Sequence, residues 1–308
     1  MAVPVRNEER SVGPLIDSLL RQTHAPDEIL LADGGSTDGT VREASRYAGQ
    51  GVRVLEIGPA YPGRGRNAAI RAARNDWIAL IDAGCRAEPG WLASLAAGAH
   101  TLGPGVVFGE VRPELDGEWD VAQALAFVGR FDRDAGVHPP FIASSLIHRS
   151  AWEAAEGFPE DLRAAEDLVF MERLRSRGVP SARCPDAVVR WRLPSGPRAM
   201  FARFRLYSAH HLAAGLGHTW HHRVMAMDLA GLALVLFSLA WPPVLLLALA
   251  GGAGRVLRTV WTRRCNVDHA PLRPDRLLRV ALLIGLSDVA MWAGALDHIG
   301  GRRFRVDG

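Results

Sequence analysis

Residues 77–85, WIALIDAGC, read as a buried strand that ends at a carboxylate. The apolar run from Trp77 to Ile81 has the length of a strand, and Asp82 follows it directly, with small residues after it. A run that is apolar at every position is typical of a strand covered on both faces, as in a parallel sheet. The stretch therefore predicts a core strand whose end presents Asp82, and its surroundings decide which fold contains it.

Strand and helix patterns alternate from the first residues up to this stretch. Short apolar runs predict strands, and the segments between them, with apolar residues near helical spacing, predict helices. The expected strands are 2–5, 28–33, 52–58 and 77–82, and the expected helices are 11–22, with Ser11 as its N-cap, 36–48 and 63–75. This alternation predicts an α/β fold with a mostly parallel sheet and helices on both faces.

Polar residues gather where the expected strands end. Asn7 and Glu8 follow the first strand, Asp33 ends the second, and Asp82 ends the fourth. Any one of these acids is equally well explained as a helix cap or a turn residue. Because ligands of open α/β sheets bind outside the carboxyl ends of the strands, the three positions together favour a binding site.

Composition narrows the possible functions. The chain has 308 residues, 48% of them hydrophobic, which suffices for one large buried core or two smaller ones. A formal charge of only +3 argues against a nucleic-acid partner. Cys85, Cys184 and Cys265 are scattered, so they predict neither a disulfide framework nor a zinc site.

Five motifs follow one another along the chain: PVRNEE, LLADGGSTDGT, GRGRNAAIRAA, LIDAGC and GFPEDLRAAEDLVFMERLRSRG. Each motif alone is a weak signal, but in this order and at these spacings they resemble the family 2 inverting glycosyltransferases, over residues 1 to about 210. The resemblance implies a GT-A fold and an enzyme that moves a sugar from a nucleotide-sugar donor, with a UDP-linked donor favoured.

The resemblance also implies which residues hold the donor: Pro4, Asn7, Glu8, Asp33, Gly34, Arg66 and Asn67. The residue types suit this role, because a carboxylate accepts hydrogen bonds from a base or a ribose hydroxyl, and glycine lets the backbone approach a ligand. A guanidinium at a helix start suits a phosphate. The alternative for DGGS is a turn that enters a helix, and for Arg66 a solvated arginine.

A metal ion is the expected cofactor. Members of this family usually carry Asp-x-Asp at the end of the fourth strand, where the acids coordinate a divalent ion, and here Asp82 is followed by Ala83 and Gly84. Mg²⁺ or Mn²⁺ needs only one or two carboxylates when substrate phosphates and water complete its shell. Asp82 is therefore the expected metal ligand, and the loss of the second acid leaves metal dependence open.

The catalytic base is expected at Asp167. Glu166 and Asp167 begin an amphipathic helix, where the helix dipole alone would favour acids. The resemblance implies that Asp167, with Glu166 beside it, takes the proton from the acceptor hydroxyl, a contribution typically worth about 10²- to 10⁴-fold in rate. Processive relatives carry Gln-x-x-Arg-Trp near residues 203–207, but this chain has RFRLY there, which favours a single addition.

The C-terminal part is expected to contact a membrane. We expect a catalytic domain at 1–197, a basic amphipathic interfacial segment at 198–227, and a membrane-embedded helical tail at 228–308. Residues 229–252 carry no charge, and the apolar run 280–296 contains only Asp288. A single span and a shallow hairpin broken at Pro242–Pro243 both fit the first run.

Arginine clusters favour the hairpin. Positive residues collect on the cytoplasmic side of membranes, and a hairpin keeps both clusters there together with the catalytic domain. The clusters are Arg255, Arg258, Arg263, Arg264, Arg273 and Arg276, and then Arg302, Arg303 and Arg305. The leading hypothesis is a glycosyltransferase of the cell membrane that faces the cytoplasm and uses a lipid-linked or saccharide acceptor. The alternatives are a polyprenyl-phosphate glycosyltransferase and a non-catalytic scaffold that binds nucleotide sugars.

Overall fold

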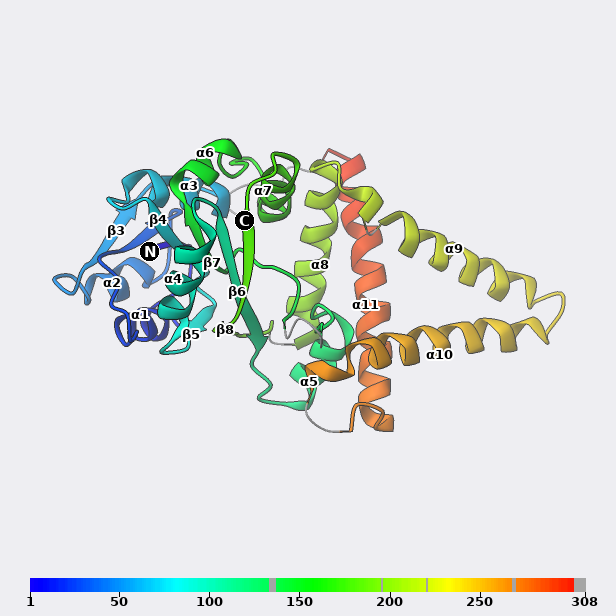
Figure 1. Cartoon of the computed structure of the whole chain (residues 1–308). Coiled ribbons are helices and arrows are strands. Elements are labelled where there is room, and N and C mark those ends of the chain that lie inside the picture. The colour runs from blue at the N-terminus through cyan, green and yellow to red at the C-terminus, as the bar shows by residue number, and fades with distance from the viewer. Residues whose placement is uncertain (133–136, 195, 220, 268–269, 302–308) are drawn as a thin grey trace. The chain divides into compact units, whose positions relative to one another are not determined.

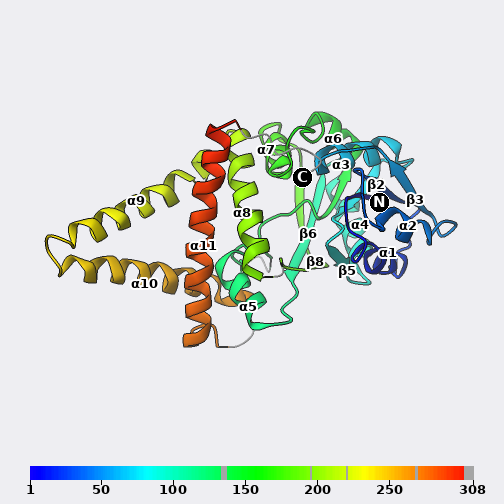
Figure 2. The same ribbon diagram turned by 180° about the vertical axis from the view of Figure 1, so that it is seen from behind.

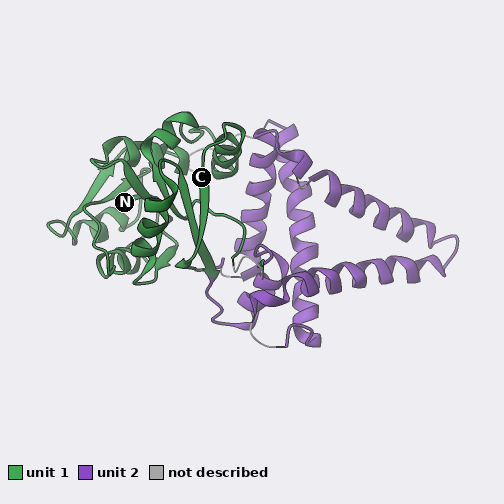
Figure 3. Cartoon of the chain, in the orientation of Figure 1, with its two compact units in different colours: residues 1–112, 132–192, 304–308 green, residues 113–131, 193–303 purple. Residues whose placement is uncertain are grey.

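The computed structural model describes residues 1–132, 137–194, 196–219, 221–267 and 270–301 (Figure 1). The described residues form two compact units (Figure 3). Unit 1 contains those within 1–112 and 132–192, and unit 2 contains those within 113–131 and 193–303. Residues 113–131 thus leave the first unit and pack in the second, which no sequence pattern indicated. Arg302, Arg303 and Arg305 lie outside the described residues.

Unit 1 is built on an eight-stranded sheet with the order β3-β2-β1-β4-β7-β6-β8-β5. The strands are β1 (Ala2–Val5), β2 (Ile29–Asp33), β3 (Val52–Glu56), β4 (Trp77–Ile81), β5 (Cys85–Ala87), β6 (Val106–Pro113), β7 (Ser144–His148) and β8 (Ser181–Trp191). The pairs β1–β2, β2–β3 and β1–β4 are parallel, whereas β4–β7, β6–β7 and β5–β8 are antiparallel. The predicted α/β class is confirmed, and the sheet is mixed because β7 runs antiparallel to both of its neighbours, β4 and β6, and β5 pairs antiparallel with β8.

Helices cover both faces of the sheet, as predicted. Successive strand residues point to opposite faces, so Leu31 of β2 packs with one core cluster and Leu30 with the other. The first cluster includes residues of α1 (Val12–Leu20), α2 (Thr40–Ser45) and α4 (Trp91–Leu102). The second includes residues of α3 (Pro62–Ala72), α6 (Arg149–Ala154) and α7 (Glu166–Ser176).

Of two predicted helix starts, the one at Ser11 is confirmed in position and the one at residue 36 is corrected. Ser11 occupies the N-cap position of α1, but its hydroxyl makes no cap bond and instead donates to the backbone oxygen of Glu8 at 3.3 Å. The helix expected from residue 36 begins only at Thr40. The preceding residues form a turn, because Thr37 N donates to Asn7 Oδ1 at 2.8 Å and Thr40 N to Asp38 Oδ1 at 3.0 Å.

Unit 2 is helical, with two of its long helices packed side by side (Figure 1). Its α-helices are α5 (Glu118–Ala126), α8 (Gly196–Ala213), α9 (His221–Phe237), α10 (Val244–Arg263) and α11 (Pro274–Ile299). Arg205 of α8 pairs with Asp297 of α11 through contacts of 2.5 and 2.8 Å, and Ser208 Oγ donates to the backbone oxygen of Met291 at 2.7 Å. The α8 segment, expected to lie on a membrane, thus has a face committed to α11.

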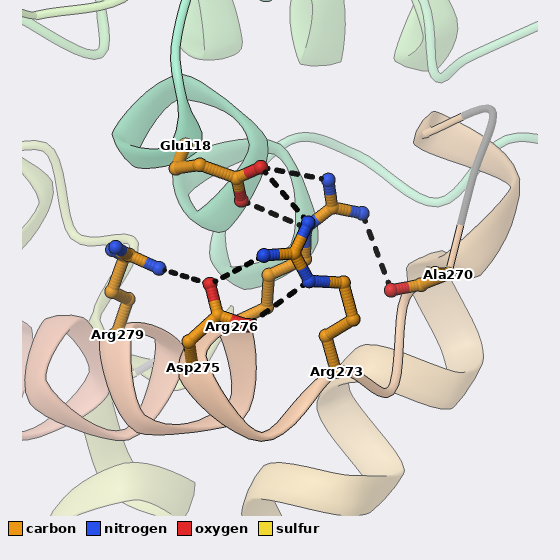
Figure 4. Close-up of polar contacts among 6 residues, drawn as sticks. All are labelled: Glu118, Ala270, Arg273, Asp275, Arg276 and Arg279. Carbon is orange, nitrogen blue, oxygen red and sulfur yellow. Dashed lines mark hydrogen bonds and ion pairs between the residues drawn. The ribbon is translucent and has the colours of Figure 1, made fainter.

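A charged network ties α5 to the start of α11 (Figure 4). Glu118 accepts hydrogen bonds from Arg276 Nε at 2.9 Å and Nη2 at 3.0 Å, and from Arg273 at 3.4 Å. Asp275 accepts from Arg279 at 2.6 Å and also pairs with Arg273. These contacts, together with the packing of α5 on α10 and α11, join residues 113–131 to the helices of unit 2.

The close crossing of α8 and α11 leads to a stability prediction. A Cβ at Gly294 would lie 2.2 Å from the Arg205 backbone oxygen and 2.6 Å from Ser208 Cβ. Gly294→Ala should therefore destabilise the detergent-solubilised chain by about 1–3 kcal/mol, the usual cost of overpacking. Gly285 in the same helix faces open space, so Gly285→Ala should not destabilise it. Thermal unfolding of both variants checks this, and equal shifts would contradict it.

Candidate active site

The candidate site lies at the carboxyl ends of β1, β2 and β4. β1 lies between β2 and β4, so the strand order reverses at β1. Such a reversal is a topological switch point, and open α/β sheets bind ligands there. Pro4 of β1 pairs with Ala32 and Val5 with Asp33, which brings the ends of β1 and β2 level. Asp82 follows the end of β4.

The first part of the site is a loop held by Asp33 and Asn7. Asp33 is buried, and its Oδ2 accepts hydrogen bonds from the backbone N–H of Gly35 at 3.1 Å and Ser36 at 3.0 Å. Asn7 has a positive φ of 55° and its backbone N–H donates to Ser36 Oγ at 2.9 Å. Asp33 and Asn7, two of the residues predicted to bind the donor, thus hold the loop after β2 in its conformation. This agrees with the interpretation of DGGS as a turn.

Gly34, in this loop, and Glu8, which follows Asn7, are also constrained. A Cβ at Gly34 would lie 2.8 Å from the Ala60 backbone oxygen, so only glycine lets these two segments approach so closely. Glu8 is half-buried, and its backbone N–H donates to Thr40 Oγ1 at 2.7 Å while its carboxylate accepts from the Ser11 hydroxyl. Hydrogen bonds therefore connect the loop after β1 to the loop after β2.

The second part of the site centres on Arg66, which lies in the first turns of α3. Its side chain is buried, at 4% exposure, and it contacts two carboxylates: Nη1 lies 2.6 Å from Glu166 Oε1 and Nη2 lies 2.6 Å from Asp82 Oδ1. Its guanidinium carbon also lies 5.4 Å from the centre of the Phe158 ring. Arg66 thus links α3, the end of β4 and the start of α7.

The pKa values in this cluster are shifted by burial and by the charged neighbours of each group. Burial opposes the charge of Arg66, but the carboxylates of Asp82 and Glu166 outweigh it and raise the pKa of Arg66 above its ordinary value. Burial raises the pKa of Glu166 against the attraction of Arg66. Burial likewise raises the pKa of Asp167, with Arg66 opposing and Asp82 adding to the shift. Asp167 is therefore a stronger base than an exposed aspartate.

The start of α7 presents Asp167 in a fixed position. Ala165, directly before the helix, has a left-handed backbone with φ of 69°, a conformation that is unfavourable for a residue with a Cβ. Asp167 is half-buried, and its Oδ1 accepts from the backbone N–H of Leu168 at 2.8 Å. Glu166, at 5% exposure, is committed to Arg66, so the two predicted catalytic acids have different surroundings.

Asn67 is placed inside the protein. Its amide nitrogen donates to Phe158 O at 2.9 Å and Glu160 Oε1 at 2.8 Å, and its Oδ1 accepts from Trp152 Nε1 and Phe158 N, both at 2.9 Å. With 2% exposure and these four bonds, Asn67 fixes the loop that leads towards α7. The structure therefore gives Asn67 a positioning role where the resemblance implied contact with the nucleotide.

Phe158 is a site residue that the sequence analysis did not single out. Its ring stacks on Phe170 of α7 with centroids 3.9 Å apart, and Arg66 lies over it. The signal was present in the GFPE segment, whose Gly157 has a positive φ of 66°. Without the distant partners Arg66 and Asn67, this segment reads as an ordinary turn.

Asp82 is suited to be one ligand of a divalent metal ion. Its side chain is 41% exposed, although Oδ1 accepts from Arg66. A Cβ at Gly84 would meet no atom within 4 Å, so the position of the missing acid is open space. Among the residues that the structure describes, no three His, Cys, Asp or Glu side chains are grouped to hold a metal. An ion here would thus rely on substrate and water oxygens, which Mg²⁺ and Mn²⁺ accept.

The buried ion pairs of Arg66 lead to a second stability prediction. Arg66→Met leaves Glu166 buried without its cation, and breaking such a pair typically destabilises a protein by about 3–5 kcal/mol. Arg64 is exposed on the same helix, so Arg64→Met is a matched control that should change stability by less than about 0.5 kcal/mol. Urea unfolding in mild detergent measures both. A result in which Arg66→Met is no more destabilising than the control would refute the role given to the pairs.

Comparison with known proteins identifies the first half of the chain. Residues 1–151 match the family model described as Glycosyl transferase family 2. Over 105 residues the chain is 33% identical to the dodecaprenyl-phosphate galacturonate synthase of Rhizobium johnstonii, covering 32% of this chain and 31% of that protein. Over 199 residues it is 27% identical to the O-antigen chain rhamnosyltransferase WbaN of Salmonella anatum, covering 60% and 62%. The chain thus spans less than two thirds of either relative.

A solved structure with the same fold extends the likeness to nearly the whole chain. The mannosyltransferase PcManGT from Pyrobaculum calidifontis, solved in complex with GDP-Man and Mn²⁺, superposes with a TM-score of 0.57 at 18% sequence identity, covering 98% of this chain and 86% of that one. This likeness confirms the predicted GT-A fold. Residues 1–151 thus form a glycosyl transferase family 2 domain, and the likeness to PcManGT concerns the fold.

Proposed function

We propose that this protein transfers a single sugar, with inversion, from a nucleoside diphosphate sugar to the hydroxyl of a membrane-proximal acceptor, either lipid-linked or saccharide. The observation that carries the proposal is the cluster in which Arg66 holds Asp82 and Glu166 together beside Asp167, at the switch point of a family 2 domain. The cluster joins a carboxylate suited to a metal shell with a base of raised pKa.

The proposed reaction is a single displacement. As the acceptor oxygen forms a bond to the anomeric carbon, its proton passes to the carboxylate of Asp167. The bond between the anomeric carbon and the donor phosphate oxygen breaks on the opposite face, and the nucleoside diphosphate leaves with the bonding electrons. Attack opposite to the leaving group inverts the configuration of the anomeric carbon. Burial supports this role for Asp167, because it brings the pKa closer to neutral pH.

The loops after β1 and β2 supply the proposed donor site. Asp33 and Asn7 order the loop that contains Gly34, and the backbone of this loop can approach the nucleoside closely. Arg66 acts by holding Asp82 and Glu166 in place, because both of its Nη atoms contact these carboxylates. The donor base is left to experiment, with a UDP-linked sugar as the first candidate and a GDP-linked sugar, as in PcManGT, as the second.

Asp82 is the proposed protein ligand of a divalent ion. Its exposed carboxylate is a hard oxygen donor of the kind that Mg²⁺ and Mn²⁺ prefer, and the fold neighbour PcManGT was solved with Mn²⁺. When bound, such an ion would neutralise charge that develops on the diphosphate leaving group. Since Gly84 adds no ligand, we infer that the ion binds mainly together with the nucleotide.

A second function is favoured by a relative. The Rhizobium protein is named a dodecaprenyl-phosphate galacturonate synthase, and a polyprenyl phosphate acceptor would be consistent with the apolar helices of unit 2. A phosphate attacks through an oxygen that is already ionised, so this reaction has less need of a general base. The two functions therefore differ in how strongly turnover depends on Asp167.

Replacement of the base tests the proposed function. Asp167→Asn should lower sugar transfer by about 10²- to 10⁴-fold while donor binding stays nearly unchanged. Glu172→Gln changes an exposed acid on the same helix and should leave transfer unaltered. The measurement is nucleoside diphosphate release from UDP- and GDP-sugars by purified full-length protein, with and without an extract of membrane lipids.

Three other outcomes of this assay would change the conclusion. Full activity of Asp167→Asn with a polyprenyl phosphate would favour the second function. Full activity of Asp167→Asn with a hydroxyl acceptor would remove Asp167 from the mechanism. Donor binding without turnover by the wild-type protein, with every acceptor supplied, would instead indicate a scaffold.

Metal dependence can be tested at Gly84. Because a side chain at this position enters open space, Gly84→Asp should supply the missing carboxylate and tighten Mn²⁺ binding about tenfold. Gly90→Asp adds the same charge at another open position, before α4, and should not tighten it. Calorimetric titration with and without nucleoside diphosphate checks this, and wild-type protein should bind Mn²⁺ better with the nucleotide. Full wild-type activity in excess EDTA would refute the proposed metal.

A further inference from the structure

Helices α9 and α10 form a hairpin that leaves the rest of unit 2 (Figures 1 and 2). The turn between them contains Pro242 and Pro243, as the hairpin prediction required. The hairpin exposes large apolar side chains on both arms and at its tip: Leu229, Leu232, Val235, Leu236, Phe237, Leu239, Trp241, Leu245, Leu246, Leu247 and Leu249. Contiguous apolar surface on this scale is typical of a membrane or protein contact, not of a surface in water.

The length of the apolar arms fits one leaflet. No charged residue occurs from Leu229 to Gly254. At about 1.5 Å per residue, the arm Leu229–Phe237 is about 13 Å long and the arm Val244–Gly254 is about 16 Å long. The hydrocarbon core of a bilayer is about 30 Å thick, so both arms reach about half-way.

Paired charges mark where the apolar part of the hairpin ends. Arg255 of α10 contacts Asp288 of α11 at 2.7 and 2.8 Å and Asp228 of α9 at 3.3 Å. Trp292 Nε1 also donates to Asp228 at 3.0 Å. The network joins the three helices at one level, and a tryptophan with a polar partner suits the boundary between lipid and water.

Helix α11 continues the apolar surface beyond the hairpin. One of its faces packs in the interior through residues such as Val280, Leu283 and Met291. The opposite face exposes Leu278, Leu282, Val289 and Leu296, which recur at helical spacing. α8 lies on one side of α11 and the hairpin projects from the other side in both views (Figures 1 and 2). The exposed stripe therefore faces the same side as the hairpin.

Basic residues accompany this surface. Arg223 of α9 and Arg258 of α10 are exposed beyond the two ends of the uncharged segment. Arg264 lies over the exposed ring of Trp261 with its guanidinium carbon 4.2 Å from the ring centre. Arginine and tryptophan together are characteristic of the headgroup region, where arginine is attracted to anionic lipids.

We infer that the α9–α10 hairpin enters a single leaflet of an anionic phospholipid bilayer, and that α11 lies along the surface of that leaflet. Both α10 with the residues after it (Val244–Asn266) and α11 are long and apolar enough to cross a membrane. A span by α10 would, however, place Arg255 near the bilayer centre, and a span by α11 would do the same for Asp288. One-leaflet insertion keeps their shared network at the surface. This inference is independent of the transfer reaction proposed above.

Cysteine labelling distinguishes insertion in one leaflet from a span. Ser238→Cys places a thiol in the hairpin turn, and Gln50→Cys places one on an exposed loop of unit 1, in full-length chains with Cys184 and Cys265 changed to serine. A membrane-impermeant maleimide is added to sealed vesicles from expressing cells, prepared in both orientations. Gln50→Cys should react in one orientation only. Ser238→Cys should react in neither orientation, and should react fully once detergent is added.

Two labelling results would overturn the inference. Reaction of Ser238→Cys in the orientation opposite to Gln50→Cys would show a span. Reaction in the same orientation as Gln50→Cys would show that the hairpin does not enter lipid. Recovery of the full chain in the soluble fraction as an oligomer would likewise overturn it and assign the apolar surface to a second copy of the chain.

Vesicle binding tests the lipid chemistry separately. The full-length protein should sediment with phosphatidylglycerol vesicles at least several-fold better than with phosphatidylcholine vesicles, and equal binding would refute the preference for anionic lipid. Leu239 is 82% exposed, so Leu239→Glu removes little packing and should reduce sedimentation with the anionic vesicles at least tenfold. Ala48→Glu adds the same charge at an exposed site in unit 1 and should sediment normally. Equal sedimentation of the two variants would exclude the hairpin as the lipid contact.

Discussion

The candidate site depends on one buried cation. Arg66 lies between Asp82 and Glu166, at 2.6 Å from each, and these contacts join a helix, a strand end and a second helix that are distant in the sequence. Burial of the Arg66 and Glu166 charges is tolerated because they pair with each other, and the partly exposed Asp82 is the second carboxylate that Arg66 contacts. The position of α7, and with it the environment of Asp167, follows from this arrangement. The aspartate at the end of WIALID is therefore not a lone acid, because Arg66 ties it to Glu166.

The parallel half of the fold could be predicted because its information is local. The strand 29–33 is apolar up to Asp33, and the polar residues at such strand ends mark the functional edge of the sheet. The antiparallel strands β7 and β8 and the transfer of residues 113–131 to unit 2 depend on distant partners. Asp82 was proposed because it follows an apolar strand and Asp167 because of the family resemblance, and both roles stay predictions. The interior hydrogen bonds of Asn67 and the ring contacts of Phe158 involve residues distant in the sequence, so the sequence did not indicate them.

The C-terminal helices show the same difference between what local sequence indicates and what depends on distant contacts. The uncharged run and Pro242–Pro243 predicted a hairpin, and the structure has helices on either side of that turn. The sequence did not show that Arg255 pairs with both Asp228 and Asp288, which turns three separate charges into one network. Nor did it show that α8 is committed to α11 through Arg205, Ser208 and the close approach at Gly294. In both units, paired charges connect elements that are distant in the sequence.

A double-mutant cycle between Arg66 and Glu166 tests the central interaction most directly. The free energies of unfolding of the full-length protein, Arg66→Met, Glu166→Gln and the double variant give the coupling between the two side chains. If Arg66 holds Glu166 as described, removing both should be much less damaging than the sum of the single changes, with a coupling of about 1–3 kcal/mol. Additive effects within about 0.5 kcal/mol would contradict the account, because the ion pair would then not be what positions α7.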